Sequence, residues 1–225
     1  MFGSKNLEVK NILIALDLTT DVLKEVLKNN VNLIVTHHPF LFDQSKEGLK
    51  NEYMQAPYKK AILESLQENN IALYVAHTNF DKTGMPKALA EALKILKIHK
   101  IPKGYPYGFI GDYNSDSDII AKKINDLGVC VVKKPDQKIK TKKVAFFPGG
   151  SGGDFIQYIN SKKAGANLMV ISEMKHHIKV TAKEMNIPFL VVEHDIEKVI
   201  IPYLTKVLNK KFKDEVNVIP YGGDK

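Results

Sequence analysis

The chain has 225 residues, of which 44% are hydrophobic, and its 33 basic and 25 acidic side chains give a formal net charge of +8. This length fits one large domain or two lobes, and the hydrophobic content excludes a disordered protein. No apolar stretch approaches the ~20 residues that a membrane span needs, and the first ten residues are too polar for a signal peptide, so a cytoplasmic protein without membrane contact is expected.

The charge and the single cysteine narrow the function classes further. Most basic residues are lysines in dispersed pairs, with no arginine-rich stripe, which favours a solvated lysine surface over a nucleic-acid-binding face. A small anionic substrate is compatible with the same charge. Cys130 lies in an apolar run that predicts a buried strand, so a disulfide framework and a cysteine-rich zinc site are both excluded.

The first hundred residues alternate short apolar runs with segments of helical periodicity. Thr20 is the predicted N-cap of the first helix, and Pro86 is suited to the first position of the third. The predicted strands are 11–16, 32–36 and 71–76. The predicted helices are 20–30, 58–70 and 86–96.

A turn-rich segment, residues 101–113, then predicts a lobe boundary near 100–113. The alternation resumes with predicted strands at 129–134, 143–148, 167–172 and 188–193. The predicted helices are 116–128, 152–165, 176–186 and 195–212, with a bend expected at Pro202. Strands separated by helices of this length predict an α/β fold, in which residues 1–225 form one domain of two intimately packed lobes with largely parallel sheets.

Metal-type ligands follow three of the predicted strands. His37 and His38 follow 32–36, His77 and then Asp81 follow 71–76, and His194 and then Glu197 follow 188–193. Ligands gather at the carboxyl ends of strands in parallel sheets, and imidazoles with carboxylates suit zinc, manganese or iron. The pattern therefore predicts a divalent-metal site.

Each residue alone also has a structural interpretation. The two adjacent histidines could cap a strand, His77 could be a hydrogen-bonded core residue, and Asp81 could be a turn residue. Glu197 could be an ordinary acidic residue of a first helical turn. Asp17 also follows a strand, where a plain turn aspartate is favoured over a residue that orients a ligand. The other histidines are predicted to face solvent: His99, His176 and His177.

The blocks ILIALDLT, LIVTHHPFLF, YVAHTNFD, GGSGGDFI, ISEMKHH and VVEHDIE resemble, in this order, the Nif-three-like family. The resemblance covers residues 10–205, and the THHP block is its most specific part. It implies two divalent ions per subunit, a homo-hexamer, and the compact form without an inserted central domain. Family members usually carry a further segment before the first strand, with a Trp-Asp-Asn block, which this sequence lacks.

The resemblance also assigns roles to residues. The implied metal ligands are His37, His38, Asp81, His194 and Glu197, with His77 as an acid-base group, a ligand, or a residue that orients the ligands. The family has glutamate four residues after the last histidine, where this chain has Lys198. Glu197 lies three residues after His194 and is the expected substitute, with Glu193 as a competitor. Because Pro39 ends the strand, each histidine of the HHP block is predicted to address a different ion.

The predicted function is metal-dependent hydrolysis of a nucleotide or a related heterocycle, similar to GTP cyclohydrolase type 2 homologues by the same resemblance. A non-catalytic metal-binding or interaction scaffold is the alternative, and a nucleic-acid-associated ring is a weaker one. The PGGSGG loop, residues 148–153, could bind the phosphate of such a substrate through its backbone N–H groups, or could simply form a tight turn.

Overall fold

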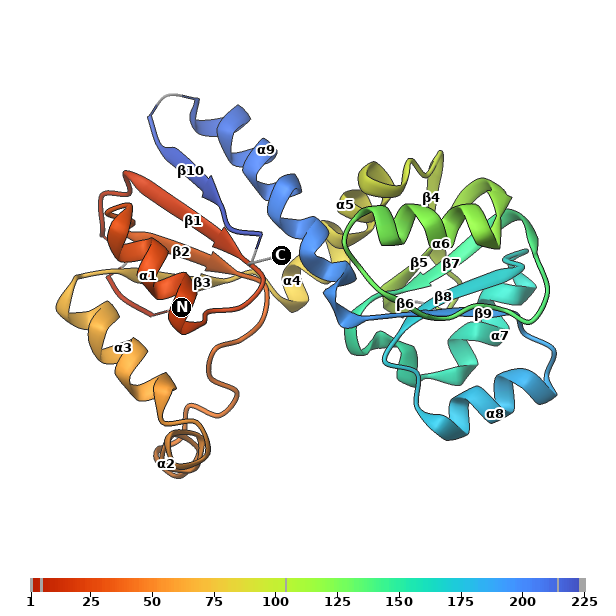
Figure 1. Cartoon of the computed structure of the whole chain (residues 1–225), viewed down its shortest axis with the longest axis horizontal. Coiled ribbons are helices and arrows are strands. Elements are labelled where there is room, and N and C mark those ends of the chain that lie inside the picture. Colours follow the sequence, from red (N-terminus) through yellow and green to blue (C-terminus); the bar gives the residue numbers. More distant parts are fainter. Residues whose placement is uncertain (1, 5, 104, 214, 223–225) are drawn as a thin grey trace. The chain divides into compact units, whose positions relative to one another are not determined.

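A computed structural model describes residues 2–4, 6–103, 105–213 and 215–222 (Figure 1). The chain divides into two compact units, which we call unit 1 (Met1–Thr78 and Ile200–Lys225) and unit 2 (Asn79–Val199). The division does not fall near residues 100–113, where the sequence predicted a boundary. Apart from Gly104, which lies outside the described residues, that segment belongs to two antiparallel strands of unit 2 and their connection. Pro106, Gly108 and Gly111 of this segment lie within β5, so they do not form a linker between lobes.

Unit 1 contains a sheet of four parallel strands in the order β10-β1-β2-β3. The apolar, β-branched composition of these runs suits strands that are covered on both faces. Because all four run in one direction, their carboxyl ends meet at one edge of the sheet, which is where the ligand-type residues follow. The strands are β1 (Asn11–Ala15), β2 (Leu33–Thr36), β3 (Ala72–Val75) and β10 (Asn217–Pro220).

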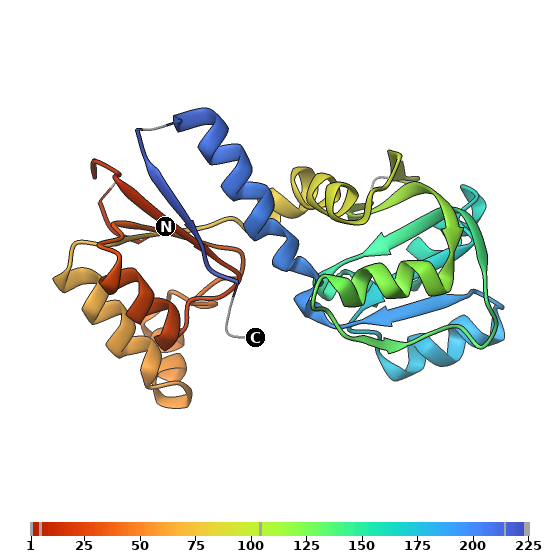
Figure 2. The same cartoon turned by 45° about the horizontal axis from the view of Figure 1, so that its top comes forward.

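Helices cover both faces of this sheet: α1 and α3 lie along one face and α9 along the other (Figure 2). Thr19, one residue before the predicted cap, caps α1 by accepting a hydrogen bond from the Val22 amide at 3.2 Å. Pro202 does not bend a long helix, since α9 begins at Ile200 and proline is tolerated in a first turn. The helices of unit 1 are α1 (Thr20–Lys28), α2 (Lys46–Gln55), α3 (Tyr58–Glu68) and α9 (Ile200–Phe212).

Unit 2 contains a six-stranded sheet in the order β4-β5-β7-β8-β9-β6. The expectation of largely parallel pairing fails here, because only β7-β8 and β8-β9 are parallel and the other three pairings are antiparallel. The strands are β4 (Lys97–Ile101), β5 (Tyr105–Asp116), β6 (Val131–Lys133), β7 (Lys140–Phe147), β8 (Leu168–Ser172) and β9 (Phe189–Val192).

In unit 2, α6 lies on one face of the sheet, and α7 and α8 lie on the other (Figure 1). Tyr158 of α7 and Phe147 of β7 are fully buried and pack edge to face, with ring centroids 4.8 Å apart. The helices are α4 (Thr78–Thr83, which begins at the last residue of unit 1), α5 (Met85–Leu93), α6 (Ser117–Asp126), α7 (Phe155–Lys163), α8 (His176–Glu184) and the 3₁₀ helices η1 (Gly149–Gly153) and η2 (His194–Val199).

The mixed α/β class is confirmed, with corrections to single elements. The sequence did not predict α2, α4, β4, β5 or β10. Cys130 is exposed and precedes β6, so the prediction of a buried cysteine strand is wrong, because β6 is a short strand at the edge of its sheet. In the described part of the chain, no helix combines the length and the apolar character that crossing a membrane requires.

Candidate functional site

The two adjacent histidines begin where β2 ends, at Thr36. The backbone amides of His37 and His38 both donate to the Leu16 carbonyl beyond β1, at 3.1 and 3.0 Å. The Thr36 hydroxyl donates to the His38 carbonyl at 3.0 Å. These bonds turn the chain immediately after the strand, so the two rings do not alternate across the sheet as strand neighbours do.

The His37 side chain is fully buried, and its ring is oriented by the backbone that follows β3. Its Nδ1 lies 2.8 Å from the Ala76 carbonyl oxygen. A carbonyl oxygen only accepts hydrogen bonds, so Nδ1 carries the hydrogen and Nε2 of the neutral ring holds the lone pair. This is the tautomer in which histidine coordinates a metal through Nε2.

The His38 ring is oriented in the same way, by the strand on the other side of β2. Its Nδ1 lies 2.8 Å from Oδ1 of Asp17, which follows β1. The carboxylate accepts this hydrogen bond, and the Nε2 lone pair of the neutral ring is again left for coordination. The expectation that Asp17 is a plain turn residue is therefore wrong. The two histidines are thus anchored on opposite neighbours of β2, His37 beyond β3 and His38 beyond β1.

His77 adds a third imidazole to unit 1. Its ring centroid lies 5.2 Å from that of His37 and 6.2 Å from that of His38, and the two adjacent rings are 5.1 Å apart. The Thr78 hydroxyl lies 3.3 Å from Nδ1 of His77. The chain then enters α4, whose first turn contains Asp81, the half-buried first acidic residue of unit 2. Three imidazoles that follow β2 and β3 therefore lie close together within unit 1.

In unit 2, His194 lies between two carboxylates at the end of β9. Its Nε2 is 2.9 Å from Oε2 of Glu197, and its Nδ1 is 2.8 Å from Oε1 of Glu173. The hydrogen bond to Glu197 is the main cause that raises the pKa of His194 to about 9, the bond to Glu173 adds to it, and burial opposes it. Both ring nitrogens therefore carry a hydrogen at neutral pH.

Glu197 is better placed than Glu193 to act with His194. Only 4% of Glu197 is exposed, whereas Glu193 is exposed to solvent. The 3₁₀ helix η2 lets residues three apart share a side, which brings Glu197 under the His194 ring. Lys198, at the position where the family has glutamate, is paired with Asp195.

Sequence reasoning missed Glu173. This residue directly follows β8, the parallel neighbour of β9, and has a left-handed backbone with φ of 48°. The same strand-end rule that found His194 applies to it, because the carboxyl ends of β8 and β9 lie side by side. It was overlooked because a glutamate shortly before a helical pattern is also typical of an ordinary first turn.

The remaining histidines and the glycine loop do not join these groups. His176 and His177 are exposed at the start of α8, as predicted. His99 is not without a partner, because its Nε2 lies 2.8 Å from Oδ1 of Asp112 on the facing strand. In the loop, the Glu197 carboxylate lies directly against Gly149, so the arrangement favours a tight turn over an anion site.

Candidate ligands are therefore present in both units. The donor set consists of imidazoles and carboxylates without thiolates, which suits zinc, manganese or iron. Two of the imidazoles have the tautomer that coordination requires, so the residues fit a divalent metal. The side chains that qualify as ligands are His37, His38, His77, Asp81 and Glu197.

Comparisons with a family model and with curated proteins identify the same family. The family model Duf34/NIF3 (NGG1p interacting factor 3) matches residues 1–222. Proteins named GTP cyclohydrolase 1 type 2 homolog are similar to the chain. The one from Methanocaldococcus jannaschii is 32% identical over 217 residues, 92% of this chain and 80% of that protein. The one from Mycoplasmopsis pulmonis is 28% identical over 215 residues, 94% of this chain and 82% of that protein.

Solved structures share the fold. A Staphylococcus aureus protein matches with a TM-score of 0.82 at 22% identity, covering 100% of this chain and 89% of that chain. Reduced HcgD from Methanocaldococcus jannaschii matches with a TM-score of 0.72 at 26% identity, covering 97% of this chain and 86% of that chain.

Proposed function

The chain belongs to the Duf34/NIF3 family, and on that premise we propose that it binds two divalent ions and hydrolyses a nucleotide or a related heterocycle. The ligands in this proposal are His37, His38, Asp81, His194 and Glu197. The name of the similar curated proteins, GTP cyclohydrolase 1 type 2 homolog, makes GTP the first substrate to test. The homo-hexamer implied by the sequence resemblance is part of the same proposal.

The observation that carries the proposal is the orientation of His37 and His38. Their Nδ1 atoms are both held at 2.8 Å, one by the Ala76 carbonyl and the other by Asp17. A strand cap would need only one ring donating to a backbone carbonyl. Two adjacent imidazoles fixed by different acceptors, with a third ring beside them, match the way proteins orient metal-ligating histidines.

In a dinuclear site, two divalent ions lower the pKa of a water molecule and stabilise charge on the attacking and leaving oxygens. The protein contributes the positions of the donors. In this proposal, His37 and His38 would hold an ion through Nε2, and Asp81 would contribute its carboxylate. His77, beside His37 and hydrogen-bonded to Thr78, is placed to hold or move a proton, which is the acid-base role proposed for it.

Metal content and turnover test the two halves of this proposal separately. Elemental analysis after reconstitution with zinc, manganese or iron is expected to give two ions per subunit, and His38→Ala is expected to lose at least one. His177→Ala, an exposed histidine, is the matched control. Turnover of GTP, other nucleotides and phosphoesters is then measured for wild type and His38→Ala.

The outcomes separate the candidate functions. Bound metal with no turnover on any substrate of the panel would reject the hydrolase and favour the metal-binding scaffold. Absence of bound metal after reconstitution would reject both. The subunit number is measured by sedimentation, and any value other than six would reject the hexamer.

A further inference from the structure

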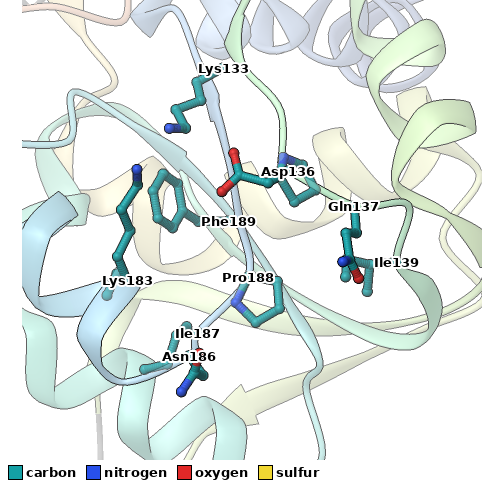
Figure 3. A pocket seen from close by; sticks show the side chains of 11 residues that line it. Lys133, Asp136, Gln137, Ile139, Lys183, Asn186, Ile187, Pro188 and Phe189 are labelled. Carbon is teal, nitrogen blue, oxygen red and sulfur yellow. The ribbon is translucent and has the colours of Figure 1, made fainter.

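A pocket of about 430 Å³ lies entirely within unit 2, between β9, the end of α8 and the segment that follows β6 (Figure 3). This volume is within the range of sites that bind small molecules. Its wall combines two lysines, one aspartate and two amide side chains with apolar residues. The polar members are Lys133, Asp136, Gln137, Lys183 and Asn186.

The two lysines point at the same space. Figure 3 shows the ammonium groups of Lys133 and Lys183 directed toward each other beside the ring of Phe189, with the Asp136 carboxylate facing them. The Lys133 Nζ lies 5.6 Å from the centroid of that ring. Burial lowers the pKa of Lys133, and the positive charges of Lys183 and Lys179 lower it further.

Two lysines close to this pocket in the sequence form ion pairs with aspartates. Lys134 pairs with Asp118 at 3.7 Å and Lys138 pairs with Asp116 at 3.0 Å. Among the described residues, neither Lys133 nor Lys183 has a carboxylate within ion-pair distance. The Asp136 charge opposes the lowering of the Lys133 pKa, but in the described part of the chain it forms no ion pair with either lysine. The two converging positive charges repel each other, so an anion that occupies the space between them stabilises the arrangement.

The pocket is separate from the candidate metal ligands. It includes Phe189 at the amino end of β9, whereas His194 follows the carboxyl end of the same strand. Five residues of extended chain span about 16 Å, at roughly 3.3 Å per residue. A ligand in this pocket therefore binds to different residues from those proposed to hold the ions, and the inference below does not depend on the proposed function.

We propose that this pocket binds a small organic anion of the mononucleotide type, with its phosphate between Lys133 and Lys183 and its planar ring against the apolar wall. The ammonium groups supply charge-assisted hydrogen bonds to phosphate oxygens. Phe189 and Pro188 provide the surface for the ring, and Asp136, Gln137 and Asn186 provide acceptors and donors for its edge.

Binding is measured by isothermal titration calorimetry of the full chain with four probes: adenosine 5′-monophosphate, ribose 5-phosphate, inorganic phosphate and adenosine. The mononucleotide is expected to bind most tightly, the two smaller anions more weakly, and adenosine not measurably. Lys133→Gln and Lys183→Gln are each expected to raise the Kd of the mononucleotide about tenfold, the effect of losing one hydrogen bond to a charged group.

Two variants control this experiment. Lys134→Gln removes the same charge from the adjacent position, outside the pocket, and is expected to leave the Kd unchanged. His38→Ala is also expected to leave it unchanged, which separates this site from the proposed metal site. The proposal is overturned if no probe binds saturably, if the Lys133 and Lys183 variants bind like wild type, or if His38→Ala abolishes binding. Equal affinity for inorganic phosphate and the mononucleotide would reject the nucleotide class.

Discussion

The histidine groups of the two units differ in how their charge is balanced. In unit 1, three imidazoles lie together, and the rings of His37 and His38 are oriented by a carbonyl and by one carboxylate. In unit 2, a single imidazole, His194, lies between two carboxylates that raise its pKa to about 9. In unit 1 the rings are thus oriented through Nδ1 by single acceptors, whereas the unit 2 imidazole is held in its protonated form by two carboxylates.

This difference implies that the two groups respond differently to a metal ion. In unit 1, the hydrogen bonds at Nδ1 make Nε2 the atom through which His37 and His38 would coordinate an ion. His194 would have to release a proton before its ring could coordinate an ion at neutral pH, because its pKa is raised to about 9. Substituting one residue of each group, and measuring metal binding in unit 1 and the pKa of His194 in unit 2, tests this difference.

The largest expected effect follows from His37→Ala. This ring is fully buried among the unit 1 imidazoles, so its loss removes a nitrogen donor that no neighbour can replace. We expect the variant to retain less than one ion per subunit after gel filtration, measured by elemental analysis, with folding checked by circular dichroism. Metal retention equal to that of the control His177→Ala would contradict a ligand role for His37.

The second effect follows from Asp17→Asn, which keeps the shape of the side chain but removes its charge. Asp17 holds the Nδ1 hydrogen of His38, and residues that orient a ligand in this way typically change metal affinity by about 10–100-fold when mutated. Competition with a chelator measures the affinity. An unchanged affinity would mean that the hydrogen bond only caps the strand.

The third effect, Glu197→Gln, acts on unit 2 and is read without metal. We expect the pKa of His194, raised to about 9 in the wild type, to fall toward its usual value of 6.5, because the larger of the two stabilising contacts is lost. NMR titration of the histidine ring in chelator-treated protein measures this pKa. A pKa that stays near 9 would show that Glu173 alone holds the proton.

The same shift fixes the sign of a pH dependence. The folded-state pKa of His194 lies above the unfolded value, so its contribution to stability is fully present below about pH 6.5 and is lost as the pH rises through about 9. Between about pH 6.5 and 9, the unfolding temperature of Glu197→Gln is expected to fall less with rising pH than that of the wild type.

The sequence predicted the unit 1 group better than the unit 2 group, for a physical reason. In a parallel sheet, strand ends meet at one edge, so residues that follow β2 and β3 could be placed together from the sequence alone. Glu173 and His194 of unit 2 also follow parallel strands, β8 and β9, but the other pairings of that sheet, apart from β7-β8, are antiparallel. Part of β5 was read as a turn-rich boundary because it contains Pro106, Gly108 and Gly111. Glu173 was missed because a glutamate before a helical pattern cannot be told from an ordinary acidic residue of a first turn.

Burial supplied what the sequence left open. Glu193 and Glu197 both lie within three residues of His194 in the sequence, so spacing alone does not show which of them contacts its ring. The 3₁₀ helix η2 and the exposure of Glu193 identify Glu197 as the partner. The role of Asp17 was also open, because a turn aspartate and an orienting aspartate follow a strand in the same way. In both cases the decisive information is the direction of a side chain, which spacing does not give.

The smallest effect that we predict concerns Gly149, whose role the sequence also left open. Its φ is 56°, and a side-chain carbon there would collide with Oε1 of Glu197. Gly149→Ala is therefore expected to lower the free energy of unfolding by about 1 kcal/mol from the left-handed backbone alone. It is also expected to lower the pKa of His194, because Glu197 is pushed from its partner. Gly150→Ala, in the same loop, meets no atom within 4 Å and should change neither quantity measurably. If the two variants unfold at the same temperature and leave the pKa of His194 unchanged, then glycine at position 149 is needed neither for the turn nor for the position of Glu197.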